Sequence, residues 1–175
     1  MENLIFLRPT AKYADQIKEY RREFLDVGEK MYGSGALRKL EDPLAFIQKC
    51  QEREFPENLP DGHVPATQFM LVRKSDGKVL GMLQVRHYLN DRLAKFSGNI
   101  GYSVRPSERR KGYAKEMLKM SLPYCREIGL DKVLITCVDG NIGSEKTILA
   151  NGGVYEYTIH EPGKNVDLKR FWIKL

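Results

Sequence analysis

Basic residues are concentrated in one short segment of this 175-residue chain, whose formal net charge is +6 at pH 7. Between Arg105 and Lys119, six basic residues stand against two acidic ones, so this window carries +4 and the rest of the chain only +2. A domain that binds a nucleic acid duplex usually spreads its positive charge along an extended face. One concentrated patch indicates instead a site for a small ligand that carries several phosphates.

A glycine in this basic segment stands where the pattern predicts the start of a helix. The segment reads Arg109-Arg110-Lys111-Gly112-Tyr113-Ala114. The N–H groups in the first turn of a helix have no intrahelical partner, and together with the helix dipole they attract anions. Gly112 has no Cβ, so a phosphate can approach the main chain there. A solvated basic turn is the alternative interpretation, because the segment is neither a Walker loop nor a dinucleotide fingerprint.

The elements that must position this segment are predicted from hydrophobic spacing and turn residues. Helices are expected at 11–25, from Asp42-Pro43 onward, from Lys111 to about Gly129 with a kink at Pro123, and at 141–150. Strands are expected at 69–73, 79–86, 100–104, 133–138, 154–159 and 166–175, and a long loop at 52–67. Residues 99–138 then form a strand–helix–strand unit that is long enough for a parallel crossover. This order favours an α+β or α/β fold with one domain.

Composition excludes several classes of protein. No apolar stretch approaches the ~20 residues of a membrane span. The first nine residues lack the basic and long apolar regions of a secretory signal. The three cysteines (Cys50, Cys125 and Cys137) are widely spaced and form no CxxC pair, so neither a disulfide framework nor a cysteine zinc site is indicated. We therefore expect a cytoplasmic protein without a bound metal or a membrane partner.

Two blocks of the sequence resemble the acyl-CoA-binding core of the GNAT acetyltransferase superfamily. The first is Asn99–Pro106 followed by Arg109–Ala114, which fits the family's loop Arg/Gln-x-x-Gly-x-Gly/Ala. The second holds Asn141, Ser144 and Asn151-Gly152-Gly153, again after a strand. With Leu83–His87 and Arg170–Ile173, these blocks are similar to a bacterial subgroup of predicted acetyltransferases.

The resemblance implies a single acetyltransferase domain over residues 1–175. Residues 68–175 correspond to the acyl-CoA-binding core, and residues 1–67 to the variable N-terminal helices and loop. The implied fold is a mixed, mostly antiparallel twisted sheet with a central parallel βαβ unit and flanking helices. The implied activity is transfer of an acetyl group from acetyl-CoA to a primary amine, by direct attack in a ternary complex through a tetrahedral intermediate. The thioester would lie where the two central strands splay apart.

The resemblance also assigns the cofactor-binding residues. The main-chain N–H groups of Arg110 to Ala114 would hold the pyrophosphate, and the side chains of Arg109 and Lys111 would neutralise phosphates. Val104 would pair with the pantetheine amide and help polarise the thioester carbonyl. The full expected set is Tyr102, Ser103, Val104, Arg109, Arg110, Lys111, Gly112, Tyr113, Ala114, Asn141, Ser144 and Ile148.

The acid and base of the reaction are not assigned by the resemblance. Many members of the family have Glu where this chain has Asn99, and others have a catalytic Tyr where this chain has Ile148. Substitutes in the sequence are Tyr102, Ser144 or Tyr155 as acid, and His87, Glu156 or a water on Asn99 as base. His87 and Tyr102 each share a strand face with apolar residues, so packing roles are the alternative for both. A thiol leaves with a pKa of about 8.5 and needs little acid assistance.

Three functions stay open at this point: an acetyl-CoA-dependent N-acetyltransferase, a CoA-binding module without turnover, and a nucleic-acid-binding domain suggested by the basic charge. The concentration of that charge argues against the third. The loop at 52–67 and the turn Glu161–Asn165 are expected to border the acceptor pocket. The acceptor amine and the oligomeric state cannot be read from the sequence, although dimers are common in the family that the chain resembles.

Overall fold

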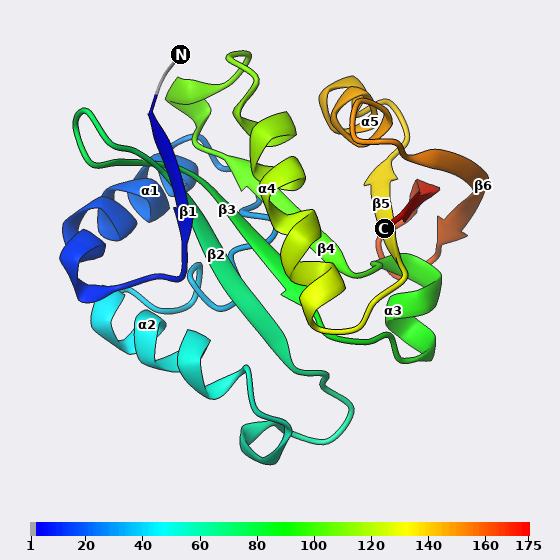
Figure 1. The fold of residues 1–175 in the computed structure, drawn as a ribbon, viewed down its shortest axis with the longest axis horizontal. Helices are drawn as coiled ribbons and strands as arrows, with labels where there is room; N and C mark the ends of the chain where they lie inside the picture. The colour runs from blue at the N-terminus through cyan, green and yellow to red at the C-terminus, as the bar shows by residue number, and fades with distance from the viewer. Residues whose placement is uncertain (1–2) are drawn as a thin grey trace.

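Seven strands of this chain form two antiparallel sheets, which the computed structural model describes over residues 3–175. The first sheet has the order β1-β2-β3-β4 and the second β5-β7-β6. The strands are β1 (Leu4–Leu7), β2 (Ala66–Arg73), β3 (Lys78–Arg86), β4 (Ile100–Val104), β5 (Lys132–Val138), β6 (Val154–Glu161) and β7 (Val166–Lys174). The helices are α1 (Ala14–Asp26), α2 (Pro43–Glu52), α3 (Asp91–Phe96), α4 (Tyr113–Glu127) and α5 (Ile142–Leu149). Figure 1 shows both sheets, with α4 lying across the front of the first.

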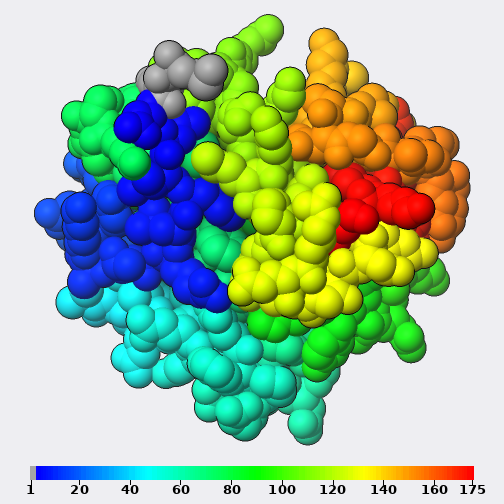
Figure 2. Space-filling view, in the orientation of Figure 1, coloured from blue at the N-terminus to red at the C-terminus, as the bar shows by residue number. Residues whose placement is uncertain are grey.

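Both faces of the first sheet are buried because helices cover each of them. On one face Leu71 and Leu83 pack in a cluster with Met117 and Leu118 of α4. On the other face Met70 and Met82 pack in a second cluster that includes residues of α1 and α2. Adjacent residues of a strand point to opposite faces, so the near-continuous apolar runs of β2 and β3 supply both clusters. The yellow-green atoms of α4 separate the blue N-terminal part from the orange and red C-terminal part in Figure 2.

Local signals set the ends of several elements as predicted. Asp42 caps α2 by accepting a hydrogen bond from the Leu44 N–H at 3.0 Å, and Pro43 is the first helical residue. The turn at Gly77 joins β2 to β3 as a hairpin. Gly129 follows α4 with φ of +90°, as expected of a glycine after a helix C-terminus. The alternation and turn residues therefore specified most boundaries within two or three residues.

Some expectations were wrong. Residues 4–7 form β1, which the sequence did not predict because the strand has only four residues. Helix α3 was also missed, since it has only six residues. Helix α4 begins at Tyr113 and not at Lys111, because Gly112 takes a left-handed conformation. The loop expected at 52–67 is shorter than predicted: α2 runs to Glu52, residues 56–58 form a 3-10 turn, and β2 begins at Ala66.

The two sheets join at one end of the cleft that separates β4 from β5. Asn99 donates its main-chain N–H to the carbonyl of Leu134 at 2.7 Å and accepts the Leu134 N–H on its side-chain oxygen at 2.8 Å. Thr136 Oγ1 donates to the carbonyl of Ser97 at 3.1 Å. Beyond this junction β4 and β5 belong to different sheets and make no ladder. The expected strand–helix–strand crossover is therefore present, and its two strands are separated along most of their length.

No helix among residues 3–175 is long and apolar enough to span a membrane. Within the same residues, His, Cys, Asp and Glu side chains form no group of three that could hold a metal ion.

Candidate functional site

A large cleft of about 810 Å³ opens between β4 and β5. One wall is β4, and the other is formed by the end of β5 and the start of α5. The loop at 29–33, the basic segment that enters α4, and residues near the β6–β7 turn complete the lining. The cleft exists because β4 and β5 are edge strands that pair with β3 and β7 on one side only.

The loop at 29–33 is held against β4 by hydrogen bonds and by a close backbone approach. Ser103 Oγ donates to the carbonyl of Tyr32 at 2.6 Å, and the Tyr20 hydroxyl donates to the carbonyl of Ser103 at 3.0 Å. A Cβ at Gly33 would lie 2.1 Å from the carbonyl oxygen of Gly101, so only glycine permits this approach. The loop is thereby fixed as one border of the cleft.

The basic segment presents main-chain N–H groups to the cleft at the start of α4. Gly112 occupies the N-cap position with φ of +85°, and no side chain caps the helix. Within residues 3–175, no hydrogen bond uses the N–H groups of Gly112, Ala114 or Lys115. No atom lies within 4 Å of the place where a Gly112 Cβ would be. Free N–H groups at a helix N-terminus attract anions, so the start of α4 has the features on which the predicted phosphate site depends.

Three of the six cations between Arg105 and Lys119 are already paired with carboxylates, which the sequence did not predict. Arg109 makes an ion pair with Glu29 at 2.5 Å, and Lys111 makes one with Glu108 at 2.8 Å. Arg105 is buried and makes an ion pair with Glu23 at 2.5 Å. The side chains expected to neutralise phosphates therefore have protein partners: Glu29, from a distant segment, pairs with Arg109, and Glu108, three residues away, pairs with Lys111.

Arg110 differs from Arg105, Arg109 and Lys111. Its side chain makes no hydrogen bond or ion pair within the described part of the chain, and its φ of +64° is left-handed. Arg110 lines the cleft together with Gly112.

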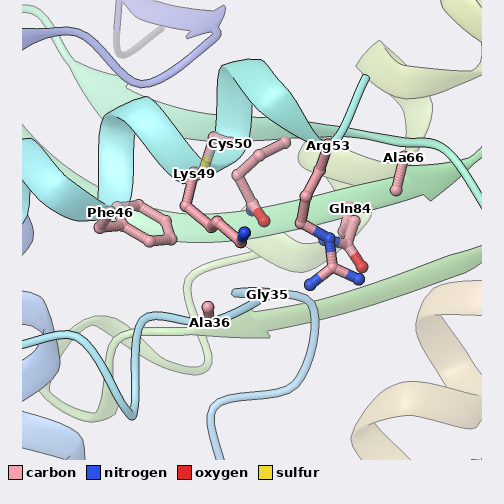
Figure 3. Close-up of a pocket in the computed structure, with 9 residues that line it drawn as sticks. Gly35, Ala36, Phe46, Lys49, Cys50, Arg53, Ala66 and Gln84 are labelled. Carbon is pink, nitrogen blue, oxygen red and sulfur yellow. The ribbon is translucent and has the colours of Figure 1, made fainter. Parts of the chain in front are cut away.

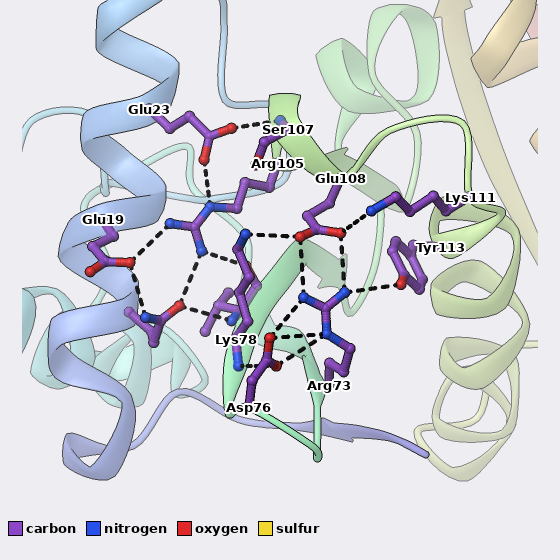
Figure 4. A network of polar contacts seen from close by, with 12 residues as sticks. Glu19, Glu23, Arg73, Asp76, Lys78, Arg105, Ser107, Glu108, Lys111 and Tyr113 are labelled. Atoms are coloured by element: carbon purple, nitrogen blue, oxygen red, sulfur yellow. Dashed lines mark hydrogen bonds and ion pairs between the residues drawn. The ribbon is translucent and has the colours of Figure 1, made fainter. Parts of the chain in front are cut away.

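Glu108 anchors the base of this loop in a buried charge cluster (Figure 4). Its carboxylate lies 3.1 Å from Arg73 Nη1 and 2.8 Å from Lys78 Nζ, in addition to its contact with Lys111. Hydrogen bonds from Arg73, then from Lys111 and Lys78, hold the pKa of Glu108 well below its usual value, although burial opposes this shift. Glu108 therefore remains ionised and fixes the loop against the β2–β3 hairpin.

Tyr102 and Ser144 meet across the cleft from opposite walls. The Tyr102 hydroxyl on β4 lies 2.8 Å from Oγ of Ser144 on α5. Burial raises the pKa of this phenol, so it stays protonated and available as a donor. The sequence analysis allowed Tyr102 a packing role; its ring does pack against the core, while its hydroxyl lines the cleft.

Ser103, Val104 and Asn141 also line the cleft, as expected. The carbonyl of Val104 accepts a hydrogen bond from Arg109 Nε at 3.2 Å. The Asn141 side chain accepts the Ser144 N–H at 3.2 Å and so caps α5. Asn141 therefore positions Ser144 as well as bordering the cleft.

Four sequence-predicted site residues lie outside the cleft lining, and Lys111, which pairs with Glu108, is one of them. Asn99 is buried, and its side chain is committed to Leu134 and to the carbonyl of Arg86, so it joins the sheets and does not face the cleft. Ile148 is fully buried in the core, which overturns the expected contact with a cofactor. His87 lies outside the cleft lining, and its Nε2 is 2.8 Å from Thr67 Oγ1. This last contact matches the packing alternative for His87.

Two other residues proposed as acid or base are also outside the cleft lining. Glu156 makes an ion pair with Arg170 at 3.0 Å, and the hydroxyl of Tyr155 lies 2.9 Å from Thr158 Oγ1.

The cleft also contains residues that the sequence analysis did not single out for it. They are Arg86, Phe96, Thr136 and Cys137, among others. Of the two segments expected to border the acceptor pocket, the β6–β7 turn lines the cleft through Glu161 and Lys164, whereas the segment 52–67 does not line it. No local signal marked Arg86 for the cleft, because β3 is buried almost throughout and shows no alternation.

Comparison with known proteins identifies the family. A family model described as an acetyltransferase (GNAT) domain matches residues 4–154 of this chain. No protein of curated function matches the sequence.

Several solved structures share the fold. A ribosomal-protein-S5-alanine acetyltransferase from Vibrio fischeri is similar with a TM-score of 0.75 and 17% identity, over 99% of this chain and 94% of that one. A microcin C7 self-immunity acetyltransferase, solved with acetyl-CoA and AMP, has a TM-score of 0.72 and 18% identity, over 100% and 94%. A putative acetyltransferase from Salmonella typhimurium, solved with acetyl-CoA, has a TM-score of 0.66 and 13% identity, over 98% and 94%.

Proposed function

The chain belongs to the GNAT acetyltransferase family, and from this premise we propose that it transfers the acetyl group of acetyl-CoA to a primary amine by direct attack within a ternary complex. The observation that carries the proposal is the cleft between β4 and β5, which has an anion site at one end and the Tyr102–Ser144 pair between its walls. Similar structures solved with acetyl-CoA support the choice of acyl donor.

The residues of the cleft fit the chemical parts of acetyl-CoA. The N–H groups at Gly112 and Ala114 suit a diphosphate, because they are oriented donors at the positive end of a helix dipole. Arg110 adds a cation that has no protein partner within residues 3–175. The edge of β4 suits an amide-containing arm, which can pair with a free strand edge in the way another strand would. Acetyl-CoA supplies an activated acyl carbon when bound there.

Proton transfer in the cleft falls to the chain's own side chains. Because the amine must lose a proton and the departing thiolate gains one, the site needs an acceptor and a donor. We assign the donor to Tyr102, whose hydroxyl stays protonated and is oriented by Ser144. Glu161 is the carboxylate best suited as acceptor: it is buried, it lines the cleft, and its ion-pair partner is the exposed Lys164 at 3.1 Å. Glu29 and Glu108 also line the cleft, but they hold cations of the basic segment.

A steady-state assay tests the proposal. Purified protein is mixed with acetyl-CoA and a panel of primary amines, and release of free CoA thiol is followed together with mass analysis of the acetylated product. Thiol release that depends on the amine, with one acetyl group added per thiol, is the expected result. Binding of acetyl-CoA without turnover for any amine would contradict it.

The second candidate function is a CoA-binding module without turnover. It is favoured by one specific observation: Asn99 replaces the carboxylate that many relatives have, and its side chain is fully used in joining the sheets. The same assay separates the two, because a binding module gives calorimetric heat with acetyl-CoA but no amine-dependent thiol.

A further inference from the structure

Arg86 is a cation at the closed end of the cleft without a protein carboxylate as its partner. It ends β3, lines the cleft beside Gly33 and Gly101, and is partly buried. Its Nη1 donates to the carbonyl of Gly98 at 3.0 Å, and no Asp or Glu among residues 3–175 makes an ion pair with it. A guanidinium has five N–H donors in a planar fork, so one carbonyl leaves most of them unused.

Neighbouring positive charges add to the effect of the missing acidic partner at Arg86. Burial, followed by the positive charges of Arg53 and Arg92, lowers the pKa of Arg86. Figure 3 shows the guanidinium of Arg53 beside the side chain of Gln84, with Lys49 nearby. Repulsion between the charges of Arg86, Arg53 and Arg92 is unfavourable, and an anion bound at Arg86 would reduce it. This end of the cleft is therefore ready for a negatively charged group.

The carboxylates that line the cleft do not fill this role. Glu29 is paired with Arg109, Glu108 with the cluster in Figure 4, and Glu161 with Lys164. None of these pairs lies at the closed end of the cleft near Asn99, where Arg86 is located. None of the carboxylates that line the cleft therefore pairs with Arg86, which is left available to an anion that enters the cleft.

Two other unpartnered atoms belong to a separate cavity and not to the surroundings of Arg86. Arg53 Nε and Gln68 Oε1 are buried without a hydrogen-bond partner, and both residues line a small cavity of about 10 Å³. A cavity of that size holds about one water, which can satisfy both atoms. Arg86 does not line this cavity; it lines the large cleft.

From this arrangement we infer that the acceptor amine carries an anionic oxygen group, a carboxylate or a phosphate, and that Arg86 binds it. The inference rests on the proposed acetyltransferase function and specifies its acceptor class. A planar guanidinium binds two oxygens of such a group at once, which fixes the orientation of the acceptor as well as its charge. Arg86 is in this sense a specificity-determining residue, placed at the end of the cleft opposite the anion site at Gly112.

Matched pairs of acceptors test the inference. Each pair consists of an amino acid or an amino-alkyl phosphate and the same amine with that anionic group amidated or removed, and kcat/KM is measured for both members. Wild type should favour the anionic member by about 10- to 100-fold, the range expected for a charge-assisted bidentate contact. Arg86→Gln should remove most of this preference, mainly through KM, and Arg86→Lys should restore part of it. Comparison of the amino acids with the amino-alkyl phosphates shows whether the site prefers a carboxylate or a phosphate.

Arg92→Gln is the matched control, because it removes the same charge from an exposed residue outside the cleft lining. The Arg92→Gln variant should keep the preference for the anionic acceptor. The logarithm of its ratio of kcat/KM values should be at least half of the wild-type value. A wild type that uses the neutral member equally well, or an Arg86→Gln variant that keeps the full preference, would overturn the inference while leaving the acetyltransferase function intact.

If no acceptor of the panel is acetylated, the result contradicts the proposed function and does not test anion binding by Arg86. A second measurement tests that binding directly. Succinate and inorganic phosphate are titrated calorimetrically into protein saturated with CoA. Saturable binding of either anion to wild type that Arg86→Gln weakens at least tenfold supports the anion site. Absence of binding to wild type, or equal binding to both proteins, rejects it.

Discussion

Asn99 and Leu134 form hydrogen bonds in both directions, 2.7 Å from the Asn99 N–H to the Leu134 carbonyl and 2.8 Å from the Leu134 N–H to the Asn99 side-chain oxygen. An asparagine thus imitates a strand partner for the main chain at the junction of the two sheets. Beyond this pair, β4 and β5 diverge and the cleft opens. Asn99 therefore positions the walls of the cleft.

Asn99→Ala should destabilise the protein by about 1 to 3 kcal/mol, because it leaves the buried N–H of Leu134 without a partner. Chemical denaturation measures this free energy of unfolding. Asn58→Ala, in an exposed turn, is the control and should cost much less. If Asn99→Ala unfolds at the wild-type denaturant concentration yet has lost activity, Asn99 acts in the chemistry and its positioning role is refuted.

Tyr102→Phe should lower kcat by about 100-fold, the low end of the range for an acid catalyst, because a thiolate leaves readily. The KM for acetyl-CoA should change little, since only the hydroxyl is removed. Ser144→Ala should have a smaller effect of the same kind, and the double variant should resemble Tyr102→Phe, because the two hydroxyls act as a unit.

Tyr155→Phe removes a hydroxyl that lies outside the cleft lining and is the matched control for this pair. Full activity in Tyr102→Phe would show that the phenol does not donate the proton.

Gly112→Glu should weaken binding of acetyl-CoA by more than about 100-fold, because it places a side chain and a negative charge where a phosphate would sit. Isothermal titration calorimetry measures the dissociation constant. Gly112→Ala tests the effect of the backbone conformation without the added charge. Because φ is +85°, this substitution should lower the free energy of unfolding by about 1 to 2 kcal/mol. No atom within 4 Å obstructs the new Cβ.

Gly129→Glu carries the same charge at a similar φ of +90°, at the opposite end of α4. It should bind acetyl-CoA as wild type does. Equal binding by Gly112→Glu and Gly129→Glu would exclude the phosphate site at the start of α4.

Glu108→Gln should cost about 3 kcal/mol at pH 7, because it leaves partly buried cations without their anion. The pKa of Glu108 is lowered in the folded state, first by Arg73 and then by Lys111 and Lys78. Such a carboxylate contributes stability above its unfolded pKa of about 4.3, and this contribution is lost as the pH falls towards the folded pKa. The gap between wild type and variant should therefore be full near neutral pH and shrink below about pH 4.3.

Thermal unfolding of both proteins between pH 3 and pH 7 measures this gap. Glu57→Gln changes an exposed carboxylate that makes no ion pair within residues 3–175, and it serves as the control. A gap that widens in acid would mean that the ion pairs of Glu108 do not stabilise the fold.

Features encoded by neighbouring residues were predictable from the sequence. The Asp42-Pro43 start of α2, the hairpin at Gly77 and the glycine N-cap of α4 at Gly112 each depend on a few adjacent residues whose backbone preferences are strong. The blocks around Asn99 and Asn141 were enough to indicate the family, because their order and spacing together are specific. Short elements such as β1 were missed, since four residues carry too little periodicity.

Only the tertiary structure decided which side chains meet. Glu29 pairs with Arg109 and the Tyr102 hydroxyl crosses to Ser144, through contacts between residues far apart in the chain, whereas Arg86 is left without a carboxylate. The sequence determined the kind of loop, helix start and fold, because local backbone preferences and hydrophobic spacing act over a few residues. The partner of each charge depends instead on how the two sheets diverge, and that divergence is fixed by long-range packing and by the hydrogen bonds of Asn99.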